Sequence, residues 1–249
     1  MRVALQGLKA NALGRVAARP ITVELDEPTF SITFDDVHRS AVRNGVPILL
    51  DHHAAATFYV ASGLIGRDAF LDASDLETLK THGFDIACHT YSHYRLDRGS
   101  SRGLALDAQR NRSAFEGEAL VGRPRDFCYP FGEVSGSAKR LVGQAYATAR
   151  SVYPGVNNVG SDLLLLRANP LFSPSVRWDA VKSLLAQATE QNGWVIFYTH
   201  GVDLDPDARS CTPEDLDQLL DECHRAGLVA RSVRSVSEAL LPDWSPLAR

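Results

Sequence analysis

The chain is poor in cysteine, and its cysteines are not arranged in pairs. Its 249 residues include four cysteines, none of them in a Cys-x-x-Cys motif: Cys88, Cys128, Cys211 and Cys223. The first 19 residues do not resemble a secretory signal, because polar residues such as Gln6 and Lys9 interrupt the apolar stretch. We therefore expect free thiols in a reducing compartment, with the cytoplasm as the default location.

The chain also lacks an excess of positive charge and long apolar runs. Its 26 Lys and Arg residues and 30 Asp and Glu residues give a net charge of -4, so we expect no nucleic-acid partner. No apolar run approaches the roughly 20 residues of a membrane-spanning helix. Hydrophobic residues still make up 45% of the chain, enough for a sizeable core. Because no linker, repeat or low-complexity segment divides it, we expect one domain over residues 1–249, with its core at about 29–240.

Short apolar segments rich in β-branched and aromatic residues recur along the chain, as expected for buried strands. Eight strands are predicted, at residues 31–36, 56–61, 84–90, 126–130, 147–152, 163–167, 194–200 and 228–232. Amphipathic helices are predicted between most of them, at residues 74–81, 103–121, 137–145, 179–191 and 213–226. For the first helix we expect Ser74 as N-cap and Glu77 in a capping box. For the last we expect Thr212 as N-cap, Pro213 at the first position and Gly227 as the stop.

This alternation predicts an α/β fold with parallel strands and right-handed crossovers. Seven to eight parallel strands in a chain of this length match a (β/α) barrel, and a doubly wound open sheet is the alternative. The segment 153–160 leaves no room for a helix, so the barrel is expected to be distorted or incomplete. In either fold, functional side chains collect where the parallel strands end.

Two predicted strands end in residues suited to binding a divalent metal. Asp35 and Asp36 close the first strand, and His89 and His93 follow the third. Adjacent carboxylates repel each other and lose hydration when buried, so a cation beside them would stabilise the pair. Catalytic zinc takes three protein ligands and keeps an open position, which predicts a site formed by Asp36, His89 and His93. The alternative is a surface turn with two solvated histidines.

Other strand ends supply candidates for proton transfer and substrate contact. An ionised Asp35 beside a metal is suited to act as a general base, although Asp is also a favoured helix N-cap. His200, after the strand 194–200, is suited to protonate a leaving group, the alternative being a core histidine. The turn at 128–132 is suited to present the Phe131 N–H to an oxyanion, and Tyr129 and Pro130 are expected to contact substrate. A plain turn is the alternative there.

From about Thr29 to about Gly201, the chain resembles the polysaccharide deacetylases, also called the NodB-homology domain or carbohydrate esterase family four. Thr33-Phe34-Asp35-Asp36 is similar to the family's first motif, which implies that Asp35 is the catalytic base and Asp36 a metal ligand. His89-Thr90-Tyr91-Ser92-His93 is similar to the second, which implies that both histidines are ligands. Tyr198-Thr199-His200 is similar to the fifth, which implies that His200 is the catalytic acid.

The third and fourth motifs depart from the family pattern. The third commonly has an Arg that steadies the base, but Cys128 stands at that position, and Tyr129-Pro130-Phe131-Gly132 resembles a Tyr-Pro-Phe/Tyr-Gly branch. Arg167, near the end of a neighbouring predicted strand, is a candidate for the missing cation. The Asp-Trp pair of the fourth motif, which tunes the acid, has no clear counterpart.

The resemblance implies a hydrolase that removes an acetyl group, first of all an N-acetyl group, from a sugar. It implies one divalent metal ion, zinc first, with Co²⁺, Ni²⁺ or Mn²⁺ as alternatives. The expected substrate is an acetylated sugar, a short oligosaccharide, or a sugar linked to a lipid or nucleotide. Two other functions stay open: a non-catalytic carbohydrate-binding protein, and a hydrolase of another non-peptide C–N bond.

Overall fold

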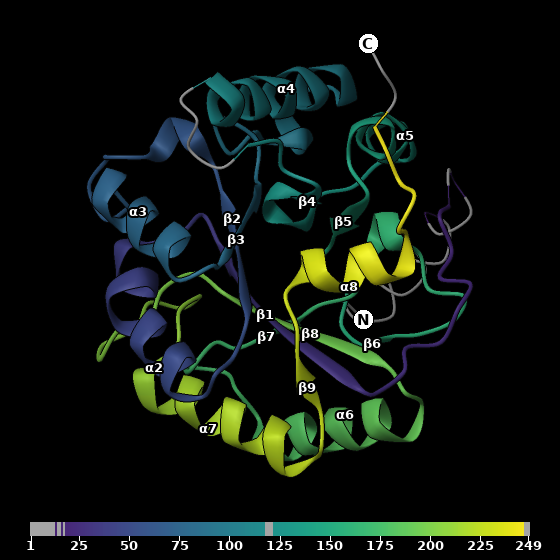
Figure 1. Cartoon of the computed structure of the whole chain (residues 1–249). Coiled ribbons are helices and arrows are strands. Elements are labelled where there is room, and N and C mark those ends of the chain that lie inside the picture. The colour runs from purple at the N-terminus through teal and green to yellow at the C-terminus, as the bar shows by residue number, and fades with distance from the viewer. Residues whose placement is uncertain (1–12, 14–15, 17, 118–121, 247–249) are drawn as a thin grey trace.

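The computed structural model describes residues 13, 16, 18–117 and 122–246, and their strands form one curled sheet (Figure 1). The strands are β1 Thr29–Asp35, β2 Ala56–Val60, β3 Asp85–Cys88, β4 Asp126–Cys128, β5 Thr148–Arg150, β6 Val156–Asn157, β7 Asn169–Pro170, β8 Trp194–Thr199 and β9 Val229–Ala230. Neighbours follow the order β5-β4-β3-β2-β1-β8-β6, while β7 also pairs with β8 and β9 with β1. All these pairings are parallel except that of β6 with β8.

The sheet curls into a distorted, incomplete barrel, so the predicted fold class is confirmed and the doubly wound alternative is wrong. Figure 1 shows the helices packed around the outer side of this sheet, with α8 crossing in front of the strands. Burial explains the apolar strands, because every residue of β1, β2 and β8 is buried. Two of these buried strands, β1 and β8, lead to the predicted site residues Asp35 and His200.

Seven of the eight predicted strands are present, and the prediction of a strand at 163–167 is wrong. Leu163–Leu165 forms a 3-10 turn, which Asp162 caps by accepting a hydrogen bond from the Leu164 N–H. Only Leu166 of this segment reaches the sheet, through an isolated bridge to Arg150. The chain then passes to β7, which pairs with β8. The segment thus spans the gap between β5 and β8 without completing a strand.

The helices largely follow the predicted ranges. They are α2 Val46–Asp51, α3 Ala73–Thr81, α4 Ser101–Gly117, α5 Gly136–Ala145, α6 Trp178–Glu190, α7 Pro213–Arg225 and α8 Val233–Leu240, with a π-helical turn, η1 Ala41–Gly45, before α2. The sequence did not predict α2 or α8. The end of the predicted helix 103–121, at residues 118–121, lies outside the described residues.

The capping prediction is right for α7 and wrong for α3. In α7, the Thr212 side chain accepts a hydrogen bond from the Asp215 N–H, and Pro213 is the first helical residue. In α3, the N-cap is Asp72, and Asp75 completes the capping box in place of the predicted Ser74 and Glu77. Asp72 also faces Arg39, so its carboxylate serves both the helix end and an ion pair.

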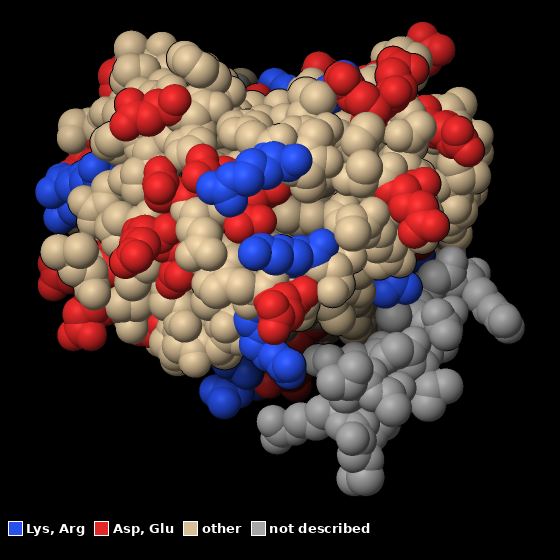
Figure 2. Space-filling model, turned by 90° about the horizontal axis from the view of Figure 1, so that it is seen from below, with Lys and Arg blue, Asp and Glu red and all other residues tan. Residues whose placement is uncertain are grey.

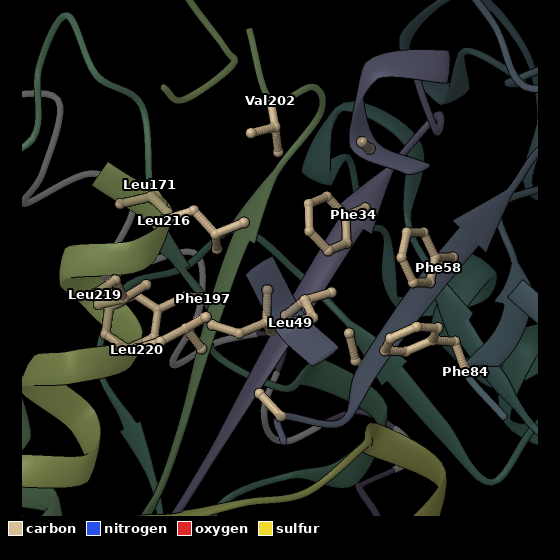
Figure 3. Close-up of a cluster of buried hydrophobic side chains, with 14 of the residues drawn as sticks. Phe34, Leu49, Phe58, Phe84, Leu171, Phe197, Val202, Leu216, Leu219 and Leu220 are labelled. Carbon is tan, nitrogen blue, oxygen red and sulfur yellow. The ribbon is translucent and has the colours of Figure 1, made fainter. Parts of the chain in front are cut away.

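The largest hydrophobic cluster packs α7 and neighbouring helices against β1, β2 and β8 (Figure 3). Phe34 and Phe58 stack with ring centroids 4.7 Å apart, and Leu219 and Leu220 of α7 lie beside Phe197 of β8. Burial of each such side chain contributes about 1.5–3 kcal/mol relative to exposure. This packing fixes β1 and β8, the strands that lead to Asp35 and His200.

Charges of both signs are mixed on the face of the molecule that Figure 2 shows. Among the described helices, none is both long and apolar enough to cross a membrane. The four cysteines are buried, and each is free.

Candidate active site

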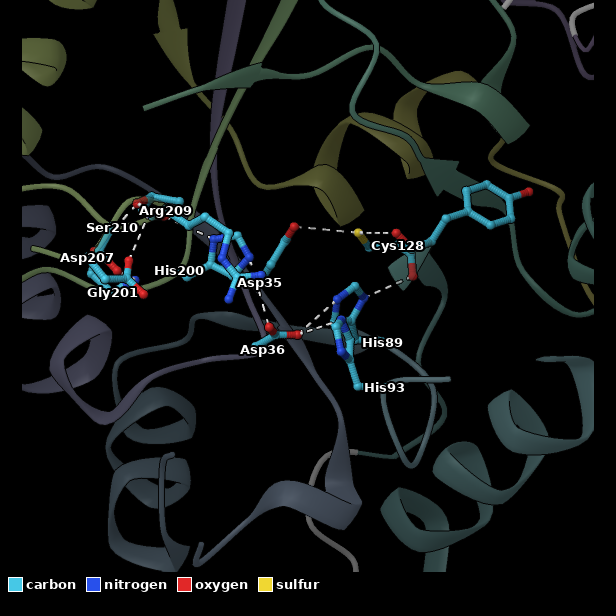
Figure 4. Close-up of polar contacts among 12 residues, drawn as sticks. Asp35, Asp36, His89, His93, Cys128, His200, Gly201, Asp207, Arg209 and Ser210 are labelled. Atoms are coloured by element: carbon cyan, nitrogen blue, oxygen red, sulfur yellow. Dashed lines mark hydrogen bonds and ion pairs between the residues drawn. The ribbon is translucent and has the colours of Figure 1, made fainter. Parts of the chain in front are cut away.

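The parallel register brings polar side chains from five strands to one edge of the sheet, where the strands end. Asp35 is the last residue of β1, Arg150 is the last residue of β5, and His200 directly follows β8. His89 follows β3, and Cys128 ends β4. Residues far apart in the sequence therefore converge on one place, as Figure 4 shows for Asp35, Asp36, His89, His93, Cys128 and His200.

The backbone at this edge is strained. Five residues without the freedom of glycine have left-handed conformations here: Asp36 (φ 59°), Val37 (φ 53°), Thr90 (φ 63°), His93 (φ 54°) and Phe131 (φ 58°). Such conformations cost free energy and persist only where the surrounding structure fixes them. Three of the five are predicted site residues, so the fold holds these side chains in place at a cost in stability.

Asp36, His89 and His93 form a compact set of metal donors. Asp36 Oδ1 lies 3.2 Å from His89 Nε2 and 3.0 Å from His93 Nε2. The three residues each offer a ligand atom within 4.8 Å of the others. An Asp-His-His set with the remaining position open matches the donor chemistry of a catalytic zinc site. The structure thus brings together the three residues that the sequence predicted as ligands.

The hydrogen bonding of His89 supports a cation at this point. His89 Nδ1 lies 3.0 Å from the backbone oxygen of Cys128 and donates its proton there, which leaves the Nε2 lone pair facing Asp36. Asp36 Oδ1 is buried and has no hydrogen-bond partner among the described residues. Two imidazole nitrogens this close to one carboxylate oxygen need a positive charge between them, which is supplied either by protons on the histidines or by a metal ion in their place. The set therefore fits a divalent metal, and Cys128 fixes the tautomer that binds it.

Asp36 is prepared to stay ionised. Burial alone would raise its pKa, but His89 and His93 outweigh burial and hold the pKa of Asp36 well below its ordinary value of 3.8. A carboxylate that is ionised over the whole physiological range is a suitable metal ligand.

Asp35 is paired with Arg150, not with the predicted Arg167. Arg150 Nη2 donates to both carboxylate oxygens of Asp35. Arg167 instead donates from Nη1 to the backbone oxygen of Pro154, at 2.9 Å. The prediction for Arg167 is wrong because the segment 163–167 is not a strand, so it does not direct Arg167 toward β1. Asp35 is not a helix N-cap either, since no described helix begins there.

Arg150 keeps Asp35 charged inside the protein. Asp35 is only 4% exposed and Arg150 is fully buried. Burial would raise the pKa of Asp35, but the charge of Arg150, with smaller contributions from His89 and His200, brings it below 3.8. The second carboxylate is therefore an ionised group beside the metal donors, as a general base requires.

One feature of the sequence indicates that Arg150 has a buried partner. It lies inside the predicted strand 147–152, which is otherwise rich in apolar residues. A charged residue in a strand that is buried on both faces needs a buried partner of opposite charge. The sequence alone did not show that this partner is Asp35, 115 residues away along the chain.

His200 is oriented by a backbone carbonyl. Its Nδ1 lies 3.0 Å from the backbone oxygen of Arg209, and its Nε2 lies 3.9 Å from Asp36 Oδ2 (Figure 4). Burial lowers the pKa of His200 below 6.5, although Asp35 and Asp36 oppose this effect. The loop after β8 therefore supplies the hydrogen-bond partner of His200 Nδ1. The sequence did not predict this partner.

The turn after β4 places only one aromatic ring at the site. Phe131 is 40% exposed, and its ring lies 4.3 Å from that of His93 and under the guanidinium of Arg95. The prediction that Tyr129 and Pro130 contact substrate is wrong. Both side chains are buried, and the Tyr129 hydroxyl donates to the backbone oxygen of Leu164. Tyr129 packs in a hydrophobic cluster with Leu104 and Phe127, so its ring is not exposed at the site.

The same turn leaves the Phe131 N–H available. The hydrogen bonds that close the turn come from the N–H groups of Gly132 and Glu133. The N–H of Phe131 lies at the start of the 3-10 turn Pro130–Gly132, where no intrahelical acceptor exists. The oxyanion contact of the Phe131 N–H stays a prediction.

Comparisons with known proteins point to one family. The model of the family described as "Polysaccharide deacetylase" matches residues 22–149. No match was found among curated proteins.

Solved structures share the fold at low sequence identity. One is a putative polysaccharide deacetylase from Mycobacterium smegmatis, with 16% identity, a TM-score of 0.65, and coverage of 94% of this chain and 99% of that one. Another is a family 4 carbohydrate esterase from Streptomyces lividans in complex with acetate, with 16% identity, a TM-score of 0.54 and coverage of 82% and 91%. A third is a mutant of a pseudoenzyme of this esterase family with restored activity, with 14% identity, a TM-score of 0.56 and coverage of 85% and 68%.

Proposed function

Because this chain belongs to the polysaccharide deacetylase family, we propose that it is a metal-dependent hydrolase that removes an acetyl group from a sugar or short oligosaccharide. We propose an N-acetyl group first. The observation that carries the proposal is the convergence of three metal donors, Asp36, His89 and His93, beside the buried carboxylate of Asp35 and the imidazole of His200. The Streptomyces relative was solved with acetate, the product that such a reaction releases.

The metal would be held by Asp36, His89 and His93. Two imidazoles and one carboxylate suit Zn²⁺ first and also accept Co²⁺, Ni²⁺ or Mn²⁺. When bound, such an ion polarises a carbonyl and makes a nearby water more acidic.

Asp35 is positioned to accept the proton of the attacking water. Arg150 keeps its carboxylate ionised, so it can act as a base at neutral pH. His200 is positioned to protonate the departing amine, which is a poor leaving group without a proton. Its Nδ1 is engaged by the Arg209 carbonyl, so Nε2 faces the site. The Phe131 N–H is placed to donate to the oxyanion as the acetyl carbonyl is attacked.

The substrate's sugar and its location are also proposals. We propose a substrate that is a short oligosaccharide, or a sugar linked to a nucleotide or lipid, and a cytoplasmic enzyme. The buried free cysteines support a reducing compartment.

The alternative of a non-catalytic carbohydrate-binding protein has one motivation. The third motif has Cys128 in place of Arg, and a pseudoenzyme of the esterase family shares the fold. Against this alternative, Arg150 provides a cation beside Asp35, so Asp35 stays ionised and can act as a base. Acetate release is therefore the deciding measurement.

The direct test is a panel of acetylated sugars incubated with the purified protein and added zinc, with and without a chelator. Each deacetylation exchanges an acetyl group for hydrogen, and both the new amine and acetate can be quantified. We expect acetate release that the chelator abolishes and zinc restores. Sugar binding without acetate release would favour the non-catalytic alternative, and turnover of cyclic imides alone would favour a hydrolase of another C–N bond.

The role of Asp35 gives a sharper prediction. We expect Asp35→Asn to bind zinc with the stoichiometry of the parent, because Asp36, His89 and His93 are untouched. Turnover should fall roughly 10²–10⁴-fold, since the amide cannot accept the proton. Metal analysis and acetate release measure the two effects. Parental turnover in this variant would exclude Asp35 as the base.

A further inference from the structure

Two sets of potential metal ligands overlap at His89. One is Asp36, His89 and His93, and the other is Asp35, His89 and Cys128; in each set the donor atoms lie within 4.8 Å of one another. The second set offers a carboxylate, an imidazole and a thiol, which also suit zinc. A metal could therefore be bound in two ways that give Asp35 opposite roles, either a free base or a ligand.

Arg150 lies against the second set. Its Nη2 contacts both carboxylate oxygens of Asp35 and lies 2.7 Å from the sulfur of Cys128. That sulfur lies 3.8 Å from Asp35 Oδ2, so the guanidinium touches two of the three donors at once. A cation bound by this set would have to approach a fixed positive charge within a few ångströms in a buried site, where repulsion is strong.

Arg150 is also held firmly in this position. Its guanidinium carbon lies 5.2 Å from the ring centroid of Tyr59 and 4.8 Å from that of Tyr198, so aromatic rings from two strands contact it. Its Nη1 donates to the backbone oxygen of Ser151, at 2.9 Å. The cation is therefore part of a built cluster and not a mobile surface charge.

We infer that Arg150 is a positioning residue that separates the tasks of the two adjacent carboxylates, keeping Asp35 and Cys128 off the metal while Asp36 binds it. This inference rests on the proposed function, because it assumes a metal at Asp36, His89 and His93. Arg150 contacts both Asp35 oxygens and offsets their charge, which weakens the attraction of Asp35 for the ion, while each oxygen keeps a lone pair that can accept a proton. Without Arg150, the unpaired buried carboxylate would gain most by coordinating the metal. A coordinated Asp35 could no longer accept a proton from water.

The test replaces Arg150 by methionine, which is similar in length and uncharged, and loads the protein with Co²⁺ as a spectroscopic probe. Parental protein should show no sulfur-to-cobalt charge-transfer absorption in the near ultraviolet, because its ligands are oxygen and nitrogen. Arg150→Met should gain this absorption as Cys128 coordinates. The double variant Arg150→Met/Cys128→Ser should lose it again. In the zinc form, Arg150→Met should lower kcat about 100-fold or more while KM changes about twofold at most.

Arg167→Met is the matched control, because among the hydrogen bonds of the described residues the side chain of Arg167 donates only to the Pro154 carbonyl. It should keep the parental cobalt spectrum and kcat. Arg150→Lys retains a charge but lacks the second nitrogen that donates to the Ser151 carbonyl and the planar group that lies against Tyr59 and Tyr198. It should keep the parental spectrum and recover part of the kcat lost in Arg150→Met. It also serves as the test variant if Arg150→Met does not fold.

The outcomes separate this inference from the proposed function. A parental cobalt spectrum with kcat within threefold of the parent in Arg150→Met would overturn the inference and leave the deacetylase proposal intact. The same holds if Arg150→Met does not fold and Arg150→Lys gains the sulfur absorption despite its charge. If neither the parent nor any variant releases acetate but Arg150→Met gains the sulfur absorption, the proposed function fails. The inference that Arg150 keeps Cys128 off the metal then still stands.

Discussion

At the scale of single residues, Asp126 at the start of β4 is a buried ionisable group that is not one of the site residues. It is 2% exposed and accepts a hydrogen bond of 2.7 Å from the Thr148 hydroxyl of β5. Burial raises its pKa from 3.8 to about 6, and hydrogen bonds from Thr148 and Ser237 reduce this effect only in part. Ser237 belongs to α8, so this carboxyl lies where two strands and a helix meet.

Asp126 predicts a specific pH dependence of stability. Because its pKa is higher in the folded than in the unfolded protein, the folded state binds the extra proton between about pH 4 and 6. Its contribution to stability is therefore fully present below about pH 4 and is lost as the pH rises through about 6. The difference corresponds to roughly 3 kcal/mol at neutral pH.

Asp126→Asn should remove this dependence. The amide can still accept a hydrogen bond from Thr148 but carries no charge to bury. At pH 8 we expect the variant to be more stable than the parent by up to roughly 3 kcal/mol, and at pH 4 the two should be nearly equal. Urea unfolding at both pH values measures the difference. A variant that is less stable than the parent at pH 8 would contradict this account.

At the scale of elements, α7 shows how a local sequence signal becomes part of the core. Thr212 caps its N-terminus, and Leu216, Leu219 and Leu220 bury one face of the helix against the sheet. Those leucines lie three and four residues apart, which places them on one side of a helix. The helix supports β8 and so, indirectly, the position of His200.

Thr212→Ala should therefore destabilise the protein by about 1 kcal/mol, because the Asp215 N–H at the helix start loses its acceptor. Thr212→Ser, which keeps the hydroxyl, is the matched control and should unfold within a few tenths of a kcal/mol of the parent. Urea unfolding at neutral pH measures both. Equal losses in the two variants would show that the methyl group of Thr212, and not its hydroxyl, is the stabilising part.

At the scale of the whole molecule, the candidate metal site joins segments that follow two strands that are not neighbours in the sheet. Asp36 follows β1, while His89 and His93 follow β3, and β2 lies between these strands. A metal bound across them would stabilise the folded state only, because the unfolded chain does not assemble the ligands.

Metal removal should consequently lower the melting temperature. At a free zinc concentration 100-fold above Kd, binding contributes about 2.7 kcal/mol, or roughly 5–10 °C for a chain of this size. Differential scanning calorimetry of protein with zinc, with chelator, and with zinc restored measures the shift. Asp36→Ala should melt at one temperature in all three conditions. A parent that also melts at a single temperature would argue against a metal at this place.

The sequence by itself determined much of the fold and the metal donors. Alternating apolar strands and amphipathic helices predicted parallel strands with helical crossovers, because their periodicities reflect burial directly, and the number of strands favoured a barrel over a doubly wound sheet. Asp36, His89 and His93 were predictable because each follows a strand, and the ends of parallel strands meet at one edge.

Only the tertiary structure decided which cation pairs with the carboxylate of Asp35. Arg150 and Asp35 lie on β5 and β1, with three strands between them in the order of the sheet, and meet because the sheet curls. No local pattern encodes that curvature, and the same is true of the Arg209 carbonyl that orients His200. A contact across the inside of a barrel depends on the path of every strand between its partners, so it appears only once the whole chain has folded.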